Sequence, residues 1–177
     1  MITPLQDIPG GKVRSLMAGE FLFHQGDTVE SMFLLLEGEV HLIRHQTDGS
    51  HITLQRARVG AVVAEASLFS GCYHCDAVAS KVVRLLVFSK SIVLARLQTD
   101  TAFAQGWLAY LAHEVQQARF RSEVLSLKTV AAKLDAWLNW QGEGLPAKGE
   151  WKGLAGQLGV SPEALYRELA RRGGRYK

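Results

Sequence analysis

Two cysteines lie close together in the stretch Cys72-Tyr73-His74-Cys75. Two thiolates at this C-x-x-C spacing can share one soft metal ion such as copper or zinc, and His74 has a side chain that can join them. The same pair can instead close a disulfide in response to an oxidant. A third interpretation is two buried cysteines that act as small apolar residues, with His74 exposed on a loop. One pair without a second pair of ligands leaves all three interpretations open, so no cofactor is assigned.

A second group of chemically useful residues occupies a predicted helix near the C-terminal end. Gly159 can adopt the positive φ of a sharp helix end, Ser161 is a good N-cap, and Pro162 suits the first helical position. Leu165 and Leu169 are four residues apart and therefore face inward together. The spacing leaves a polar and basic outward face made of Ser161, Glu163, Tyr166, Arg167 and Arg171.

This outward face has the chemistry of a DNA-reading surface. A polar helix held at a fixed angle by a short partner helix, here predicted around Leu154 to Leu158, fits the major groove. Arginine can bond both acceptors of a guanine edge, glutamate can accept from cytosine, and serine or tyrosine can hold phosphate. From Trp151 onward there are six basic residues and two acidic ones. The alternative is a helical hairpin with a solvated charged face.

The whole chain has the composition of a folded protein. Its 177 residues allow one domain or two small ones, and its net charge of +3 with a pI of about 9.0 permits a nucleic-acid partner. No run of about 18 apolar residues is present, which predicts no transmembrane helix and no membrane partner. The first residues lack the apolar centre of a signal peptide, so the expected compartment is the cytoplasm.

Residues 19–88 have the pattern of short strands separated by turns. Ser31–Leu36 is an apolar run, residues 40–43 alternate as a strand with one buried face does, and Asp48-Gly49 is a strong hairpin signal. Residues 82–88 complete the series. Several strands at this spacing predict a sandwich or barrel, onto which the weakly patterned residues 1–18 are expected to wrap.

From Ser89 the pattern becomes helical. A short helix is predicted to about Leu97, a long one over about 99–127, and another over 129–140. The long helix carries an aromatic face and, beside it, a seam at coiled-coil spacing. One face can pack on the β domain while the other pairs with a second copy of the chain; the alternative is a helix buried once within the monomer. The predicted dimer seam is Leu108, Leu111, Val115 and Ala118.

The order of these parts resembles the CRP/FNR family of bacterial transcription regulators. GEFLFHQGDTVESMFLLLEGEVHLIR is similar to the opening strands of that family, RSEVLSLKTVAAKLDAWL to the end of its dimer helix and the next helix, and GVSPEALYRELARR to its turn and recognition helix. The resemblance implies an α+β fold: a β-roll (double-stranded β-helix or jelly-roll) sensor domain over residues 1–98, a dimerisation helix over 99–127 and a helix-turn-helix domain over 128–177. It implies three partners: a palindromic double-stranded DNA operator, a second copy of the chain and RNA polymerase.

Glu163 and Arg167 fall on the two principal base-reading positions of the family. Pro162 stands where many members have arginine, so a different half-site is expected. The family also implies a β-hairpin wing after the recognition helix, whereas this chain stops at GGRYK; the wing is then either missing or cut off. Arg175 and Lys177 can still touch phosphate. The predicted DNA-binding residues are Ser161, Pro162, Glu163, Tyr166, Arg167, Arg171 and Arg175.

The effector pocket of the family consists here of Glu65, Cys75 and Asp76. In cyclic-nucleotide-binding members a glutamate contacts the ribose and an arginine followed by serine or threonine pairs with the cyclic phosphate. Glu65 is in register, but Cys75 and Asp76 occupy the other two positions. A buried phosphate needs a cationic partner. The substitutions predict no tight binding of cyclic AMP or cyclic GMP, a structural role for Glu65, and a different effector, with copper, zinc or a thiol oxidant at Cys72, His74 and Cys75 as candidates.

Two competing functions follow from other features. A cupin-like metalloenzyme would also be a small β-roll, but no two of the six histidines are separated by a single residue, and no nucleophile–base pair stands out, so no enzyme is predicted. A regulator that has lost DNA binding and acts through dimerisation is the other alternative. An iron–sulfur cluster of the FNR kind needs four cysteines, and the chain has two.

Overall fold

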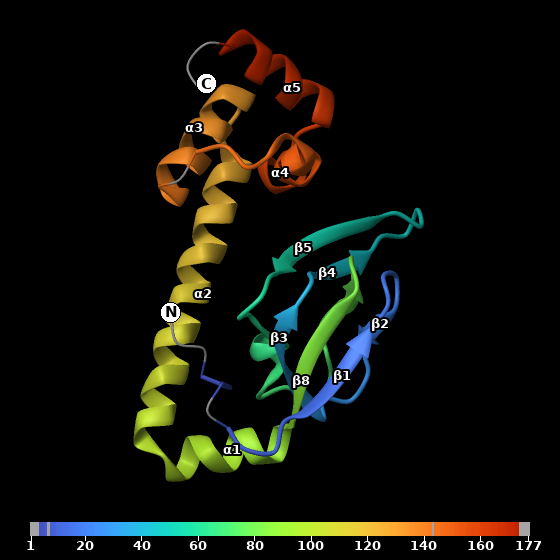
Figure 1. Cartoon of the computed structure of the whole chain (residues 1–177), viewed down its shortest axis with the longest axis vertical. Helices are drawn as coiled ribbons and strands as arrows, with labels where there is room; N and C mark the ends of the chain where they lie inside the picture. Colours follow the sequence, from blue (N-terminus) through green and yellow to red (C-terminus); the bar gives the residue numbers. More distant parts are fainter. Residues whose placement is uncertain (1–3, 7, 143, 174–177) are drawn as a thin grey trace. The chain divides into compact units, whose positions relative to one another are not determined.

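A computed structural model describes residues 4–6, 8–142 and 144–173 (Figure 1). By its internal contacts the chain divides into two compact units, one ending at Leu111 and the other beginning at Ala112. The boundary falls inside the long helix α2, Thr101–Ser126. The predicted division of the chain into three parts, with boundaries at residues 98/99 and 127/128, stays a prediction.

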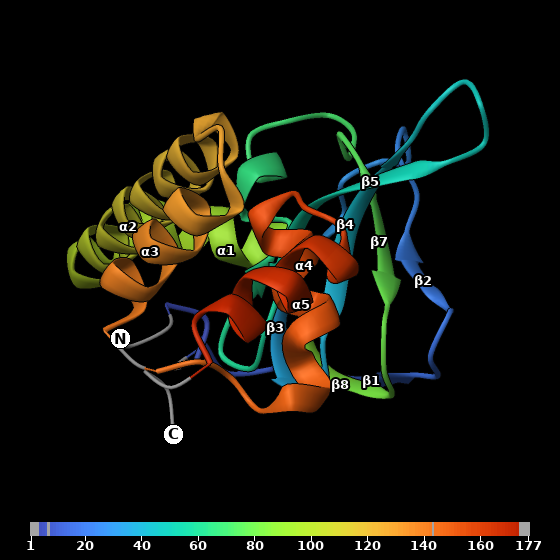
Figure 2. The same ribbon diagram turned by 90° about the horizontal axis from the view of Figure 1, so that it is seen from above.

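The first unit is built from two four-stranded antiparallel sheets. The first sheet has the order β1 (Lys12–Leu16), β8 (Val83–Ser89), β3 (Ser31–Glu37) and β6 (Val62–Val63). The second has the order β2 (Phe21–Phe23), β7 (Asp76–Ala79), β4 (Val40–His45) and β5 (His51–Ala57), as seen in Figure 2. Side chains of both sheets enter one apolar core. This is the predicted β-roll.

The alternation of apolar residues explains the strands that the sequence predicts. In β4, Val40 and Leu42 are buried and His41 between them is half-buried, as the alternation predicts. Ile43 departs from the alternation, since it is buried too, at a point where the register with β5 shifts. The turn from β3 to β4 requires glycine: Gly38 has φ +85°, and a Cβ there would lie 2.3 Å from the carbonyl oxygen of Val82. A bulky residue at this turn would push the turn away from β8.

Three strands were not predicted, and each lacks the signal that identifies a strand. β1 is an edge strand with four exposed residues out of five, so it carries no apolar alternation. β6 has only two residues. β7 begins at Asp76, inside the stretch that the sequence presents as a polar motif on a loop. The N-terminal segment was expected to wrap onto the roll, and through β1 it does so as a strand paired with β8.

The first part of α2 packs on the roll through its aromatic face. Trp107 and Tyr110 are buried in the core of the roll, and Phe103 lies alongside them. The phenol oxygen of Tyr110 accepts a hydrogen bond of 3.0 Å from the backbone N–H of Val62 in β6. The short helix α1, Lys90–Thr99, connects β8 to α2 and buries Val93. Of the two faces predicted for the long helix, the aromatic one therefore packs on the β domain.

The second unit contains the last part of α2 and three helices: α3 (Val130–Gln141), α4 (Trp151–Leu158) and α5 (Pro162–Arg171). Their apolar faces meet in a second core, to which Phe120 and Val124 of α2 also belong. Thr129 caps α3 by accepting a hydrogen bond of 3.1 Å from the backbone N–H of Ala132. The helices α1, α2 and α3 agree with the predicted ones to within two residues at each end, whereas α4 begins at Trp151, three residues before the predicted Leu154.

A buried lysine joins three helices of this unit. The Nζ atom of Lys133, in α3, donates to the carbonyl oxygen of Leu125 near the end of α2 at 3.2 Å, and to that of Leu158 at the end of α4 at 3.0 Å. These carbonyls have no partner within their own helices, and a cation at a helix C-terminus also favours the helix dipole. Lys133 thus satisfies two helix ends with one side chain.

Candidate nucleic-acid interface and effector pocket

The turn between α4 and α5 has the local chemistry that its sequence predicts. Gly159 has φ +61°, and the next N–H, of Val160, donates to the carbonyl oxygen of Ala155 at 3.0 Å. The hydroxyl oxygen of Ser161 accepts from the backbone N–H of Ala164 at 3.2 Å, and Pro162 takes the first helical position. The turn therefore sets where α5 begins and which of its faces points outward.

The inner face of α5 is apolar and its outer face is polar. Leu165 and Leu169 are buried in the second core, whereas Tyr166 and Arg167 are exposed. Glu163 is also exposed, and its pKa is lowered by a hydrogen bond from its own backbone N–H, then by Ser161 and by the nearby charge of Arg167. The helix thus presents an ionised acceptor and a guanidinium donor one turn apart, which is suited to base edges.

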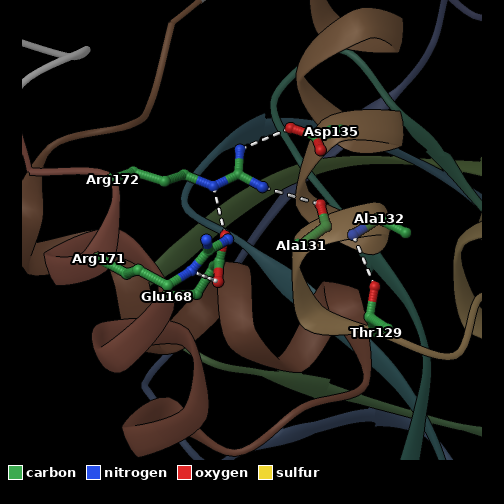
Figure 3. Close-up of polar contacts among 7 residues, drawn as sticks. All are labelled: Thr129, Ala131, Ala132, Asp135, Glu168, Arg171 and Arg172. Carbon is green, nitrogen blue, oxygen red and sulfur yellow. Dashed lines mark hydrogen bonds and ion pairs between the residues drawn. The ribbon is translucent and has the colours of Figure 1, made fainter.

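Two arginines at the end of α5 share the carboxylate of Glu168 but differ in exposure (Figure 3). Arg171 makes two hydrogen bonds to Glu168, of 3.0 and 2.8 Å, and its side chain is 69% exposed. The side chain of Arg172 is only 12% exposed and turns toward α3. The hydrogen bonds from Arg171 and then Arg172 lower the pKa of Glu168 to about 2. The predicted phosphate contacts Arg175 and Lys177 lie outside the described residues.

The predicted effector pocket is occupied by the protein's own contacts. Glu65 lies in a short 3-10 turn, Glu65–Ser67, and is buried. Asp76 is buried too, and its Oδ1 accepts from the backbone N–H of Gln25 at 3.0 Å and lies 3.2 Å from Nδ1 of His24. Its Oδ2 is 3.8 Å from Nε2 of His45. An anionic ligand placed here would meet a carboxylate that already binds these donors.

Aromatic rings fill the roll next to Cys75. The rings of Phe23 and Tyr73 stack with centroids 3.8 Å apart, and the ring centroids of Phe23 and Phe33 are 5.8 Å apart. The hydroxyl of Tyr73 donates to the carbonyl oxygen of Ser31 at 2.9 Å. Cys75 belongs to the same core. Where the family places the phosphate-binding arginine, this chain therefore has packed apolar side chains.

The structure does not bring Cys72, His74 and Cys75 together as a metal site. Burial alternates along this stretch: Cys72 and His74 are exposed, Tyr73 and Cys75 buried. Cys72 therefore lies at the surface, whereas Cys75 belongs to the apolar core. His74 instead places Nδ1 3.0 Å from the hydroxyl oxygen of Ser67. Across the described residues, no group of three or more His, Cys, Asp and Glu is arranged to hold a metal ion.

The predicted dimer seam is only partly free on a single chain. The side chains of Leu108 and Val115 are 65% and 48% exposed, unusual values for large apolar residues on a helix, and Ala118 is exposed as well. Leu111 differs, because it is half-buried and packs against the core of its own roll. The structure therefore leaves three of the four seam residues available to a second chain.

Sequence reasoning missed three residues that shape the second unit: Lys133, Asp135 and Arg172. Glu168 and Arg172 are four residues apart, a spacing at which helical side chains can pair, but nothing in that spacing shows the connection to α3. Lys133 interrupts the apolar run AAKLDAWL, and a lysine on the buried side of a helix is a sign of a specific partner. Around Asp76, the contacts of His24 and His45 likewise depend on pairing between distant strands.

The fold and this interface define a class of protein: a β-roll joined through a long helix to a helix-turn-helix. Residues 13–100 match the family model of the cyclic nucleotide-binding domain. The chain is 29% identical over 111 residues to the cyclic AMP receptor protein of Thermus thermophilus, covering 62% of this chain and 51% of that one. It is 26% identical over 151 residues to the global nitrogen regulator of Synechococcus elongatus, covering 78% and 65%.

Among solved structures, FixK2 of Bradyrhizobium japonicum has the same fold, with a TM-score of 0.75 over 93% of this chain and 86% of that one, at 19% identity. The chain is therefore similar to regulators of the CRP/FNR type, and its residues 13–100 match the cyclic nucleotide-binding domain. It spans about half to two thirds of the length of the curated relatives that it matches. The names of these relatives are those of a receptor protein and a regulator, which agrees with the prediction of a regulator rather than a cupin-like metalloenzyme. Within the described residues, no helix is long and apolar enough to cross a membrane.

The two cysteines differ in burial, and we therefore expect them to differ in reactivity. Cys75 is 1% exposed, and burial raises the pKa of its thiol to about 11, so the reactive thiolate is scarce at neutral pH. Cys72 is exposed. In the native protein at pH 7.5, we expect a maleimide to label one thiol rapidly and the other at least about 100-fold more slowly, the difference set by access and thiolate fraction.

Mass spectrometry of the labelled peptides measures this difference. The variant Cys72→Ser should leave no fast phase, and Cys75→Ser should leave the fast phase unchanged. Equal labelling rates for Cys72 and Cys75 in the folded protein would show that Cys75 is not held in the core.

Proposed function

We propose that the chain is a dimeric, effector-controlled transcription regulator that binds DNA through α5. The observation that carries the proposal is the exposed pair Glu163 and Arg167 on a helix whose start is set by a capped turn. A helix held at both its start and its apolar face can present base-reading groups at a defined angle. Similarity to a receptor protein and a regulator supports the same function.

Each outward residue of α5 has a proposed task. Arg167 reads a guanine edge through two hydrogen bonds, and Glu163 accepts from a cytosine. Ser161, Tyr166 and Arg171 contact phosphates, which position the helix on the duplex. Pro162 offers no hydrogen bond from its side chain, so it contributes shape and apolar contact instead. The ring of Tyr166 lies near the ring of Trp151, with the two ring centroids 5.9 Å apart.

The proposed dimer uses the apolar seam of α2. Leu108, Val115 and Ala118 are exposed and recur at coiled-coil spacing, which favours a parallel pairing with the same residues of a second chain. A parallel dimer presents two copies of α5, and two copies read a palindromic operator. RNA polymerase, as the further partner implied by the family, stays a prediction.

We propose an effector other than a cyclic nucleotide. A cyclic nucleotide would need a cationic side chain for its phosphate, but Asp76 and the aromatic stack of Phe23 and Tyr73 occupy that part of the roll. Arg44 is an arginine close to this stretch, and its Nη2 already donates to the carbonyl oxygen of His74 at 3.0 Å. Control by copper, zinc or a disulfide at Cys72 and Cys75 would require Cys75 to leave the core, which makes it the weaker candidate.

The proposed base contact can be tested with the variant Arg167→Ala. Loss of two hydrogen bonds to a guanine should cost about 1–3 kcal/mol on a specific duplex and relax the preference at that base pair. Fluorescence anisotropy on the specific duplex and its single-base variants measures both effects.

The control is Arg14→Ala, which removes the same charge from the exposed edge strand β1. It should leave the base preference unchanged. If Arg167→Ala keeps the wild-type preference at every position, α5 does not read bases through Arg167.

The dimer seam can be tested with Val115→Glu. In a parallel dimer this change places two carboxylates opposite each other in an apolar seam, and burying unpaired charges is strongly unfavourable. Sedimentation velocity at micromolar concentration should then show a monomer.

The matched control is Gln116→Glu, which adds the same charge at the next, exposed position of α2. This variant should sediment as the wild-type dimer does. A dimeric Val115→Glu protein would rule out this seam.

A further inference from the structure

The C-terminal end of α5 is tied to α3 by a polar cluster (Figure 3). The guanidinium of Arg172 donates through Nε to Oε1 of Glu168 at 2.5 Å, on its own helix. Its Nη1 donates to Oδ1 of Asp135 at 2.5 Å, and its Nη2 to the carbonyl oxygen of Ala131 at 3.0 Å, both on α3. The side chain of Arg172 therefore connects the end of α5 with residues of α3 that precede it by about 40 positions in the sequence.

The position of Arg172 is unsuited to a DNA contact. Its side chain is 12% exposed, and three of its nitrogen atoms already donate to oxygens of the protein. Arg171, the next residue in the chain, contrasts with it. Arg171 is bound to the same Glu168 but has no hydrogen bond to α3 among those in the described chain, and its side chain is 69% exposed.

The cluster supplies a kind of constraint that the apolar core does not. Leu165 and Leu169 hold α5 against the core, but apolar burial is non-directional and tolerates small rotations or shifts of a helix. Hydrogen bonds from a planar guanidinium are directional, and three of them in different directions allow one orientation. The start of α5 is held by the Ser161 cap, so Arg172 holds the opposite end.

We propose that Arg172 is a positioning residue for DNA recognition, which rests on the proposed function of α5. By fastening the end of the recognition helix to α3, Arg172 sets the angle at which Glu163 and Arg167 meet the base edges. On α3, Asp135 and the carbonyl oxygen of Ala131 accept two hydrogen bonds from the guanidinium of Arg172. Glu168 accepts the third one and so helps to fix the orientation of the guanidinium. Arg172 itself makes no contact with DNA.

The test uses substitutions that separate orientation from charge. Arg172→Lys keeps the charge but replaces a three-way planar fork by a single ammonium group, which cannot reach all three oxygens in the same geometry. Asp135→Asn weakens the α3 side of the cluster and makes the protein more positive. The control Arg14→Lys makes the same substitution on the exposed edge strand β1, outside the proposed DNA-binding residues.

The measured quantity is the ratio of the affinities for two DNA probes. Circular dichroism, recorded well below the unfolding temperature, checks that each variant is folded. The first probe is the duplex that the wild-type protein enriches from a random library; the second is a duplex of scrambled sequence. Arg172→Lys should lower the specific-to-nonspecific ratio about tenfold, the effect of about one mismatched base pair, with an unchanged salt dependence. Asp135→Asn should also lower the ratio, because its added positive charge strengthens binding to both probes alike, whereas the lost contact with Arg172 weakens only the specific complex. Arg14→Lys should stay within about twofold of wild type.

Three outcomes overturn the proposal. A wild-type ratio in folded Arg172→Lys would give Arg172 a structural role only. A salt dependence reduced by about one phosphate contact in the neutral variant Arg172→Gln would make Arg172 a direct DNA contact. An equal loss in Arg14→Lys would assign the effect to the exchange of arginine for lysine in general rather than to the link with α3. If the wild-type protein enriches no duplex at all, the proposed function fails instead, and that result is distinct from the other three.

Discussion

The ammonium group of Lys133 is the interaction on which the arrangement of the second unit depends. It binds the carbonyl of Leu125 at the end of α2 and the carbonyl of Leu158 at the end of α4, so the long helix and the helix-turn-helix meet at one atom. The turn is tightly packed at the same place, since a Cβ on Gly159 would lie 2.5 Å from Cδ2 of Leu125. The buried ammonium group of Lys133 would be costly without hydrogen bonds to these two carbonyl oxygens. Lys133 therefore stabilises the arrangement in which the ends of α2 and α4 lie next to α3.

The two ends of α5 are then held by different means. Near its start, Lys133, Gly159 and the Ser161 cap define the turn. At its other end, Arg172 binds α3. Between the two ends, leucine packing supplies most of the burial. A reading helix needs both burial and orientation, and in this chain the polar groups at the helix ends supply the orientation.

The roll keeps the fold of a cyclic nucleotide-binding domain while its interior has different chemistry. The strands and core are those of the family, and residues 13–100 match its model. Cys75 and Asp76 nevertheless stand where the family pattern has arginine and serine or threonine, and Asp76 is held by the N–H of Gln25. Apolar packing tolerates such changes, because fold stability depends on volume and burial, whereas anion binding depends on one charged group.

Features with a local cause could be predicted from the sequence, and features with a distant cause could not. The helix ends at Gly159 and Ser161 follow from residues that act within one turn. The difference in burial between Cys72 and Cys75 does not, because it depends on Asp76 starting a strand that pairs with β2 and β4. The cluster of Arg172 was hidden for the same reason: Asp135 and Ala131 lie in another helix, far away in the sequence.

A symmetric dimer that reads DNA through α5 would select one kind of duplex. Enrichment of the protein-bound fraction from a random duplex library, followed by sequencing, identifies that duplex. We expect an inverted repeat whose half-site centres are about 10 base pairs apart or a multiple of that spacing, the separation that two recognition helices about 34–36 Å apart require. Enrichment of no sequence, or of a single site without symmetry, would contradict it.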